Sequence, residues 1–185
     1  MFMSTKEKIL EKASELFAQY GYQETSIRKI AKEAKANSAM ISYYFGSKKA
    51  LYESVLSTNM DEFLESVSRI KAKDEKEFLK KFIKIHIGVL KKRGKYISYL
   101  MLKESATNFE QVKSLKDKYF DPLANIITRV FKTGIEKKIF KPYNEQIMLQ
   151  LLIGINVMLA LKNPQNSIEE LSNIAYDVFM RGICA

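Results

Sequence analysis

This chain has one cysteine, one histidine and three prolines among its 185 residues. The single cysteine, Cys184, excludes an internal disulfide and any metal site built from several cysteines. The single histidine, His86, argues against a histidine-based metal site. Seven glycines and three prolines are too few for the turns of a many-stranded β protein or for a disordered chain. We therefore expect a compact protein with no metal site and no cofactor.

The sequence also lacks the patterns of an enzyme. It contains no nucleophile–histidine pair, no glycine-rich phosphate loop and no carboxylate pair at a meaningful spacing. Charged residues at positions 6–8 come before any apolar run, which argues against a signal peptide. The longest apolar run, 147–161, is interrupted by Gln150 and Asn156 and is shorter than the ~20 residues of a membrane span. We expect a cytoplasmic, non-enzymatic protein without membrane association.

Positive charge is abundant. The net charge of +10 and the pI near 9.5 favour a polyanionic partner. Residues 57–142 hold 20 basic and 11 acidic residues, a net charge of +9, whereas residues 1–56 have a net charge of +3. Because most of the excess lies in the middle of the chain, ordinary solvated helix faces explain it better than a second polyanion site.

Apolar residues recur at helical spacing almost throughout, so the sequence predicts an all-α fold of about nine helices. The first helix ends at Gly21, and Thr25 or Ser26 caps the second. Asn37 or Ser38 caps the third, and Ser47 caps a long fourth helix. The expected buried residues of these helices are Ile9, Ala13, Leu16, Phe17, Tyr20, Ile27, Ile30, Ala31, Ala34, Ile41, Phe45, Leu51, Val55, Phe63 and Val67.

Later helices are predicted at 75–92, 95–105 and 108–138. The last of these must bend or restart at Asp121-Pro122, because proline cannot donate a helix hydrogen bond. The run 146–161 is apolar on nearly every side, so we expect it to be buried on nearly every side. A capping-box spacing, Ser167 to Glu170, opens the final helix. We place a DNA-binding domain at 1–50 and a helical effector-binding and dimerisation domain at 51–185, with the boundary inside the fourth helix.

The stretch 25–52 has the layout of a helix-turn-helix DNA reader. In its third helix Ile41 and Phe45 share the inward face, and the opposite face is small or polar. Such a face fits a major groove about 12 Å wide. The residues on that face are Ser38, Ala39, Ser42 and Tyr43.

Three further residue types around this helix suit a phosphate backbone. Tyr43 and Tyr44 carry hydroxyls that can bond phosphate oxygens. Lys48 lies in the first turn of the following helix, where free N–H groups already attract phosphate. Arg28 lies near the start of the second helix, within reach of phosphate or guanine. Each residue alone has an ordinary surface explanation, but the whole set is specific to DNA binding.

Residues 5–56 resemble the TetR family of one-component transcriptional regulators. The resemblance rests on the run ELFAQYGYQETSIRKIAKEA, the YYF triplet and the GSKKALY that follows. It implies an all-α homodimer with an N-terminal three-helix reader and a C-terminal domain that binds an inducer and dimerises through its last two helices. The family's phosphate-contacting positions match Thr25, Tyr43, Tyr44 and Lys48, and its base-reading positions match Arg28, Ser38, Ala39 and Ser42.

The sequence departs from the family pattern at two points. The turn between the second and third helices is Lys35-Ala36, where the family usually has glycine followed by an apolar residue. A lysine there is strained if its φ must be positive. Ser42 stands where the family often has tyrosine, so one contact is lost and DNA binding is expected to be weaker or altered in preference.

The rest of the chain is rich in methionine, tyrosine and phenylalanine, which form either a core or an apolar ligand cavity. His86 shares a helical face with Phe82, Ile85 and Val89. Such a histidine is more often a satisfied core residue than a ligand contact. As the lone polar group on an apolar stripe, it is nevertheless our best candidate for a ligand contact, together with Tyr99.

The favoured function is a homodimeric repressor that a small-molecule effector releases from a palindromic operator on double-stranded DNA. The run 147–161 has more apolar faces than one core can cover, so we place the dimer contact in residues 144–183. The main alternative is a regulator whose C-terminal domain binds a protein partner instead of an inducer. A non-specific nucleic-acid-binding protein is a further alternative, which salt dependence and sequence preference would distinguish.

Overall fold

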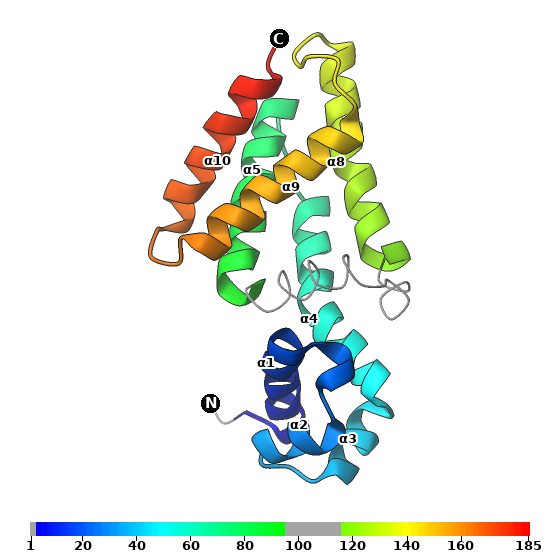
Figure 1. The fold of residues 1–185 in the computed structure, drawn as a ribbon. Helices are drawn as coiled ribbons and strands as arrows, with labels where there is room; N and C mark the ends of the chain where they lie inside the picture. Colours follow the sequence, from blue (N-terminus) through cyan, green and yellow to red (C-terminus); the bar gives the residue numbers. More distant parts are fainter. Residues whose placement is uncertain (1–2, 95–115) are drawn as a thin grey trace. The chain divides into compact units, whose positions relative to one another are not determined.

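The computed structural model describes residues 3–94 and 116–185 (Figure 1). Its N-terminal helices are α1 (Thr5–Glu24), α2 (Ile27–Glu33), α3 (Ser38–Phe45) and the long α4 (Lys48–Ser68). They are followed by α5 (Glu75–Val89), the π-helices η1 (Leu90–Gly94) and η3 (Lys116–Phe120), α8 (Asp121–Glu136), α9 (Glu145–Lys162) and α10 (Ile168–Ile183). Over these residues the only β-type pairing is one isolated antiparallel bridge, between Phe140 and Cys184. The predicted all-α fold is confirmed.

The chain forms two compact units that divide inside α4, after Met60. Among the described residues, the first unit contains those up to Met60 together with Gly94 and Lys116, and the second contains Asp61–Arg93 and Asp117–Ala185. The first turns of α4 belong with the N-terminal helices because the ring of Tyr52 packs edge-on against Phe17, with 4.9 Å between centroids. The compact N-terminal unit therefore extends beyond residue 50.

The core of the first unit is built from α1, α2, α3 and the start of α4. The caps are those that the sequence indicated: Ser26, Asn37 and Ser47 each accept a backbone N–H from the first turn of α2, α3 and α4. Gly21 interrupts α1 with a φ of +84°, close to the predicted helix end. The buried apolar residues are Ile9, Ala13, Leu16, Phe17, Ala18, Ile30, Ala31, Ala34, Ile41, Leu51, Tyr52, Val55 and Leu56.

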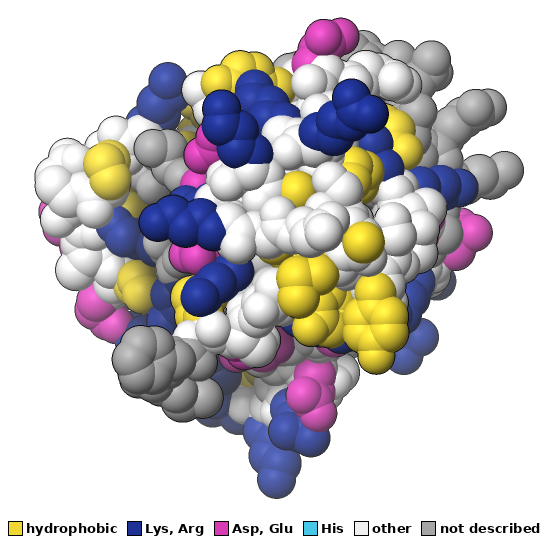
Figure 2. All heavy atoms as spheres, turned by 90° about the horizontal axis from the view of Figure 1, so that it is seen from below, with side chains coloured by type: hydrophobic (Ala, Val, Ile, Leu, Met, Phe, Trp, Pro, Cys, Tyr) yellow, Lys and Arg dark blue, Asp and Glu magenta, His cyan; other side chains and the backbone are white. Residues whose placement is uncertain are grey.

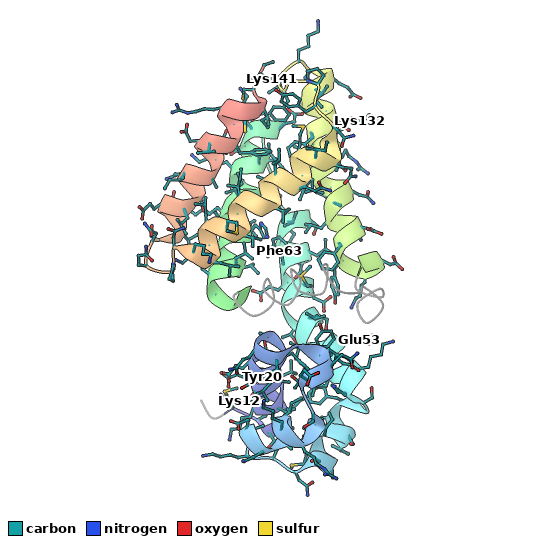
Figure 3. All side chains as sticks on the ribbon, viewed as in Figure 1. Lys12, Tyr20, Glu53, Phe63, Lys132 and Lys141 are labelled. Atoms are coloured by element: carbon teal, nitrogen blue, oxygen red, sulfur yellow. The ribbon has the colours of Figure 1, made fainter. Side chains whose placement is uncertain are left out.

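Two aromatic residues of the predicted core lie elsewhere. Tyr20 is 38% exposed, and the ammonium of Lys29 lies 3.2 Å from its ring centroid. Its place on α1 is labelled in Figure 3. Phe45 is only half-buried at the end of α3. The helical spacing placed Tyr20 on the apolar stripe, but the last buried side chains before the Gly21 kink are Phe17 and Ala18.

The turn between α2 and α3 has the strained backbone that its sequence suggested. Lys35 has a φ of +50°, and its N–H bonds the carbonyl of Lys32 over 3.2 Å. The N–H of Ala36 reaches back to the Ala31 carbonyl over 2.9 Å. A left-handed conformation costs a non-glycine residue about 1 kcal/mol or more. These backbone bonds offset that cost, so the tight turn forms without glycine.

The second unit packs α5 against α8, α9 and α10. Its α8 begins at Asp121-Pro122, as the proline requires, and Ser167 caps α10 by accepting the N–H of Glu170 over 3.1 Å. The helix predicted at 95–105 and the first part of that predicted at 108–138 lie outside the described residues. The buried apolar residues include Phe63, Val67, Leu79, Phe82, Ile83, Ile87, Leu123, Ile127, Phe131, Phe140, Met148, Leu152, Leu171, Ala175 and Phe179.

The apolar helix α9 is buried on one side only, so the prediction that it is buried nearly all round was wrong. Met148, Leu152, Asn156 and Ala160 face the core, whereas Leu151 is 56% exposed. α9 is 18 residues long, and by length and composition alone it could cross a membrane. Only 22% of it is buried inside the protein. The prediction that the run is too short to span is therefore corrected: the helix extends past the apolar run at both ends.

Candidate nucleic-acid interface

The exposed face of α3 is the main feature of the candidate interface. Ile41 is 1% exposed and fixes the helix to the first unit, so the opposite side must face outward. Ala39 and Ser42 are exposed there, Ser38 is half-buried, and Tyr43 is 84% exposed. Small side chains allow close approach to a groove floor, and a projecting tyrosine provides a hydroxyl at its edge. The sequence predicted this arrangement.

The aromatic residues at the end of α3 form a short cluster. The rings of Tyr43 and Tyr44 meet edge-on with 5.2 Å between centroids, and Tyr44 is in similar contact with Phe45. Tyr44 is half-buried, so its ring supports Tyr43 more than it projects. Sequence reasoning missed Met40, which is 38% exposed on the same helix. An apolar residue outside the Ile41 stripe was the available signal.

Arg28 and Lys48 supply positive charge on either side of α3 in the sequence. Arg28 is exposed on α2. Lys48 opens α4, and its ammonium lies 4.4 Å from the ring centroid of Tyr22 and donates to the Gln23 carbonyl over 3.3 Å. Partial burial lowers the pKa of the Lys48 ammonium from 10.5, although nearby Glu24 opposes the shift. Lys48 is thus held in place, which its position in the sequence did not reveal.

Thr25 is not placed where its side chain could reach a phosphate. Its side chain is fully buried, and its hydroxyl donates to the Gly21 carbonyl over 2.8 Å and to the Leu16 carbonyl over 3.2 Å. Both carbonyls belong to the last turns of α1, on either side of the residues that lead into the Gly21 kink. Thr25 therefore stabilises the end of α1, and the expected side-chain phosphate contact is corrected on that ground.

The face of the molecule seen in Figure 2 carries Lys and Arg side chains spread among uncharged ones and a group of exposed hydrophobic side chains. Acidic side chains are fewer on this face (Figure 2). An excess of basic over acidic side chains suits a partner that presents phosphates.

The candidate ligand contact His86 lies in the core of the second unit. Its ring stacks against both Phe63 and Phe82, with centroid separations of 5.3 Å and 5.5 Å, and the two phenylalanine rings lie 6.2 Å apart. Figure 3 labels Phe63 within this unit. The Nδ1 atom of His86 lies 3.1 Å from the side-chain nitrogen of Asn156. Burial lowers the pKa of His86 from 6.5 to about 4, so the ring is neutral at physiological pH.

The other half of this polar pair, Asn156, was not singled out from the sequence as a partner of His86. Its Oδ1 atom is buried without a hydrogen-bond partner among the described residues. Tyr99, the second candidate ligand contact, lies outside the described residues. Within residues 3–94 and 116–185, no three His, Cys, Asp or Glu side chains gather as a possible metal site.

Comparison with known proteins agrees with this geometry. Residues 9–55 match the model of the bacterial regulatory proteins of the tetR family. The chain is 49% identical over 69 residues to the probable HTH-type transcriptional regulator YttP of Bacillus subtilis, which is 37% of this chain and 31% of that protein. Over 48 residues it is 42% identical to the biofilm operon negative regulator IcaR of Staphylococcus aureus, covering 26% of each chain. The chain therefore matches less than a third of the length of these curated relatives.

Solved structures extend the likeness of fold to the whole chain. The ketosteroid transcriptional regulator KstR2 of Mycobacterium tuberculosis has a TM-score of 0.83 at 18% identity, covering 100% of this chain and 97% of that one. A putative fatty acid metabolism regulator of Clostridium perfringens has a TM-score of 0.80 at 19% identity, covering 96% and 99%. The family and these relatives are transcriptional regulators and not enzymes. Residues 9–55 thus match the DNA-binding motif of the tetR family of bacterial regulatory proteins, and the chain as a whole has the fold of solved TetR family regulators.

Proposed function

We propose that the protein is a homodimeric transcriptional repressor that binds a palindromic operator in the cytoplasm and leaves it when a small molecule binds the second unit. The observation that carries the DNA-binding part is the exposed face of α3, with small residues at its centre and Tyr43 at its edge. Such a helix enters a major groove, where the pattern of donors and acceptors distinguishes all four base pairs.

The proposed contacts fall into two groups. Arg28, Ser38, Ala39 and Ser42 read base edges, and Tyr43, Tyr44 and Lys48 bind phosphates. Thr25 is left out because its hydroxyl is used inside the first unit. Serine at position 42 makes a shorter reach than a tyrosine would, so base reading depends more on Arg28. Phosphate contacts position the protein on the duplex, and base contacts specify the sequence.

The proposed dimer contact is the exposed apolar side of α9 and α10. Ile147, Leu151 and Met158 of α9 are 53–56% exposed, as is Val178 of α10, and Ile174 is 43% exposed. Large exposed apolar surfaces mark partner sites. A second copy fits better than a lipid bilayer, because the other side of α9 is buried and carries the Asn156–His86 pair. The contact therefore lies within residues 144–183.

The proposed effector site is in the second unit, near His86. Tyr99, the other proposed ligand contact, lies outside the described residues. The buried Oδ1 atom of Asn156 has no partner among the described residues and would accept a hydrogen bond from a ligand. α4 begins in the first unit and ends in the second. A ligand that shifts the second half of α4 would therefore also act on the helix-turn-helix in the first unit. A coupling of about 1–3 kcal/mol is typical of such regulation. The alternative is that a protein partner acts on this unit.

The central experiment selects duplexes from a random library and footprints the bound sites. We expect two protected half-sites with their centres about 34 Å apart or a multiple of it, since a two-fold dimer reads two equivalent half-sites. Lys48→Ala should weaken binding to every sequence and reduce the salt slope by about one unit for each protomer on the DNA. Lys132→Ala, an exposed lysine of the second unit labelled in Figure 3, is the matched control and should leave the slope unchanged.

The effector part has its own test. Affinity for the selected duplex is measured against a library of hydrophobic and anionic metabolites, and a ligand should weaken it about 5- to 150-fold. If no duplex is preferred over random DNA, the protein is a non-specific binder. If a duplex is selected but no compound changes its affinity, while a co-purified protein does, the partner alternative holds.

A further inference from the structure

The break in α1 brings an aromatic ring and a carbonyl to the start of α4. Gly21 has a φ of +84°, which a residue with a side chain rarely adopts, and Tyr22 and Gln23 follow it. The Lys48 ammonium lies 4.4 Å from the Tyr22 ring centroid and donates to the Gln23 carbonyl over 3.3 Å. A lysine in the first turn of α4 is therefore held by two groups from the end of α1.

The Tyr22 ring is itself fixed by its neighbours. It meets Tyr52 edge-on with 4.9 Å between centroids, and it stacks on Phe17 at 6.1 Å. Phe17 and Tyr52 are fully buried and lie 4.9 Å apart. The three rings join α1 to α4, so the face that Tyr22 offers to Lys48 has a defined position in the first unit.

We propose that Tyr22 is a positioning residue for DNA binding: its ring, with the Gln23 carbonyl, holds the Lys48 ammonium at the start of α4, ready for a backbone phosphate. This inference rests on the proposed DNA-binding function and on the phosphate role of Lys48. Tyr22 itself need not touch DNA.

Two physical effects make this arrangement favourable. A free lysine loses much rotamer freedom when it binds, and a side chain already held in place loses less. The ring face also replaces part of the ammonium's water shell, in line with the lowered pKa of Lys48, so less water must be removed when a phosphate arrives. An ammonium has three N–H donors, and Gln23 takes one, which leaves donors for phosphate oxygens.

The same geometry supports the opposite role, in which the ring keeps Lys48 away from DNA, less well. A cation over a ring face uses no N–H donor, because the attraction is to the quadrupole of the ring. Lys48 also remains partly exposed. The two roles differ in sign: removing the ring weakens DNA binding if it positions the lysine and strengthens binding if it sequesters it.

The test is a double-mutant cycle on the full-length protein with a labelled 30-base-pair duplex of fixed, mixed sequence. Tyr22→Phe keeps the ring face, and pentafluorophenylalanine at position 22 keeps its size but reverses its quadrupole. We expect Tyr22→Phe to bind like wild type and the fluorinated ring to weaken binding about 2- to 5-fold for each protomer on the DNA. In a Lys48→Ala background the two rings should give equal affinity.

The control is the neighbouring pair on the other side of Gly21. The Lys29 ammonium lies 3.2 Å from the Tyr20 ring centroid, and Tyr20 is an exposed residue. Tyr20→Leu should show no coupling to Lys48→Ala, whatever it does by itself. A purely structural role of the Tyr22 ring would lower affinity equally with and without Lys48.

A measurement without DNA tests the geometry separately. Reductive methylation with labelled formaldehyde gives each lysine an NMR signal, and the ring current of Tyr22 should shift that of Lys48. The shift should persist in Tyr22→Phe and vanish in Tyr22→Leu, with circular dichroism confirming the fold.

The outcomes separate the two claims. If wild type binds no duplex, the proposed function fails and the inference fails with it. If wild type binds but the fluorinated ring has no effect, has the same effect without Lys48, or strengthens binding, only the positioning role is overturned.

Discussion

His86 is the only histidine of the chain and the one side chain whose ordinary pKa lies between pH 5 and 8. Its neighbours in the second unit are the Phe63 and Phe82 rings and the uncharged Asn156 side chain. Because the folded protein holds the ring neutral with a pKa of about 4, the unfolded chain binds a proton at higher pH than the folded chain does. Stability is then full above pH 6.5 and falls as the pH is lowered toward 4.

We predict that the free energy of unfolding decreases by about 1–2 kcal/mol between pH 7 and pH 5, and that His86→Gln removes most of this decrease. Glutamine keeps a hydrogen-bonding group near Asn156 but does not titrate. Urea unfolding at the two pH values measures the effect. An unchanged pH dependence in His86→Gln would show that His86 titrates normally in the folded protein.

Single residues show where the sequence was informative and where it was not. The strain at Lys35 was predictable because lysine stands in a turn where the family usually has glycine, and a positive φ is costly for a residue with a side chain. The burial of Thr25 was not, because its hydroxyl bonds two carbonyls of α1 near the kink at Gly21, and these contacts depend on the folded backbone. Tyr22 was missed for a similar reason: its contact with Lys48 joins residues far apart in sequence.

At the scale of elements, the turn after α8 depends on the absence of one side chain. A Cβ atom built on Gly134 would lie 2.2 Å from Cδ2 of Phe140, and the Gly134 carbonyl accepts the N–H groups of Ile139 and Phe140. Phe140 is buried and packs edge-on against Phe131 at 6.3 Å. The ring cannot move away without opening the core.

We predict that Gly134→Ala destabilises the protein by about 1–3 kcal/mol or more, even though alanine favours helix. Gly88→Ala is the matched control, because a Cβ there meets only Cδ1 of Ile168 at an ordinary 3.9 Å. Thermal unfolding of both variants gives the comparison. Equal melting temperatures would mean that the Phe140 ring shifts at little cost.

A lysine closes the loop between α9 and α10. The Lys91 ammonium, on η1, donates to the carbonyls of Asn163 at 3.2 Å, Pro164 at 2.9 Å and Asn166. One ammonium thus fills all three of its donor positions with backbone oxygens. Asn163 is the C-cap of α9, where positive charge is favourable, and Pro164 and Asn166 belong to the loop that follows.

We predict that Lys91→Met lowers the free energy of unfolding by about 1–2 kcal/mol and speeds amide exchange in the 163–166 loop. Methionine keeps most of the stem length but not the charge. The neighbouring exposed Lys92→Met is the control and should change neither quantity. Normal protection of the loop in Lys91→Met would show that these bonds are dispensable.

Helix positions followed from the sequence where a local signal marked them. Ser26, Asn37 and Ser167 cap the helices that they were expected to cap, and Asp121-Pro122 starts α8. The burial of α9 did not follow, because a helix that is apolar all round gives no local sign of which face its own chain covers. The surroundings of His86 were likewise hidden, since Asn156 lies on another helix.

For the whole molecule, the exposed apolar side of α9 and α10 leads to the prediction about assembly. Leu151 and Val178 are each 56% exposed. We predict that Leu151→Arg or Val178→Arg gives a folded monomer. Burying the arginine charge against a second copy of the chain is costly unless an acidic group pairs with it. Sedimentation at low micromolar concentration is the measurement. Met40→Arg, on the exposed side of α3, is the control and should remain dimeric.

The same variants test whether specific recognition of the operator requires the dimer. A single α3 contacts too few base pairs for useful specificity, whereas a dimer joins two half-site contacts. The monomeric Leu151→Arg protein should therefore lose most of its preference for the selected palindrome over random duplex. It should keep the weak, salt-dependent binding that its phosphate contacts provide. A variant that sediments as a monomer but still binds one half-site with full affinity would separate the two properties and contradict the dimeric reader. A variant that stays dimeric would place the contact between copies elsewhere than on α9 and α10.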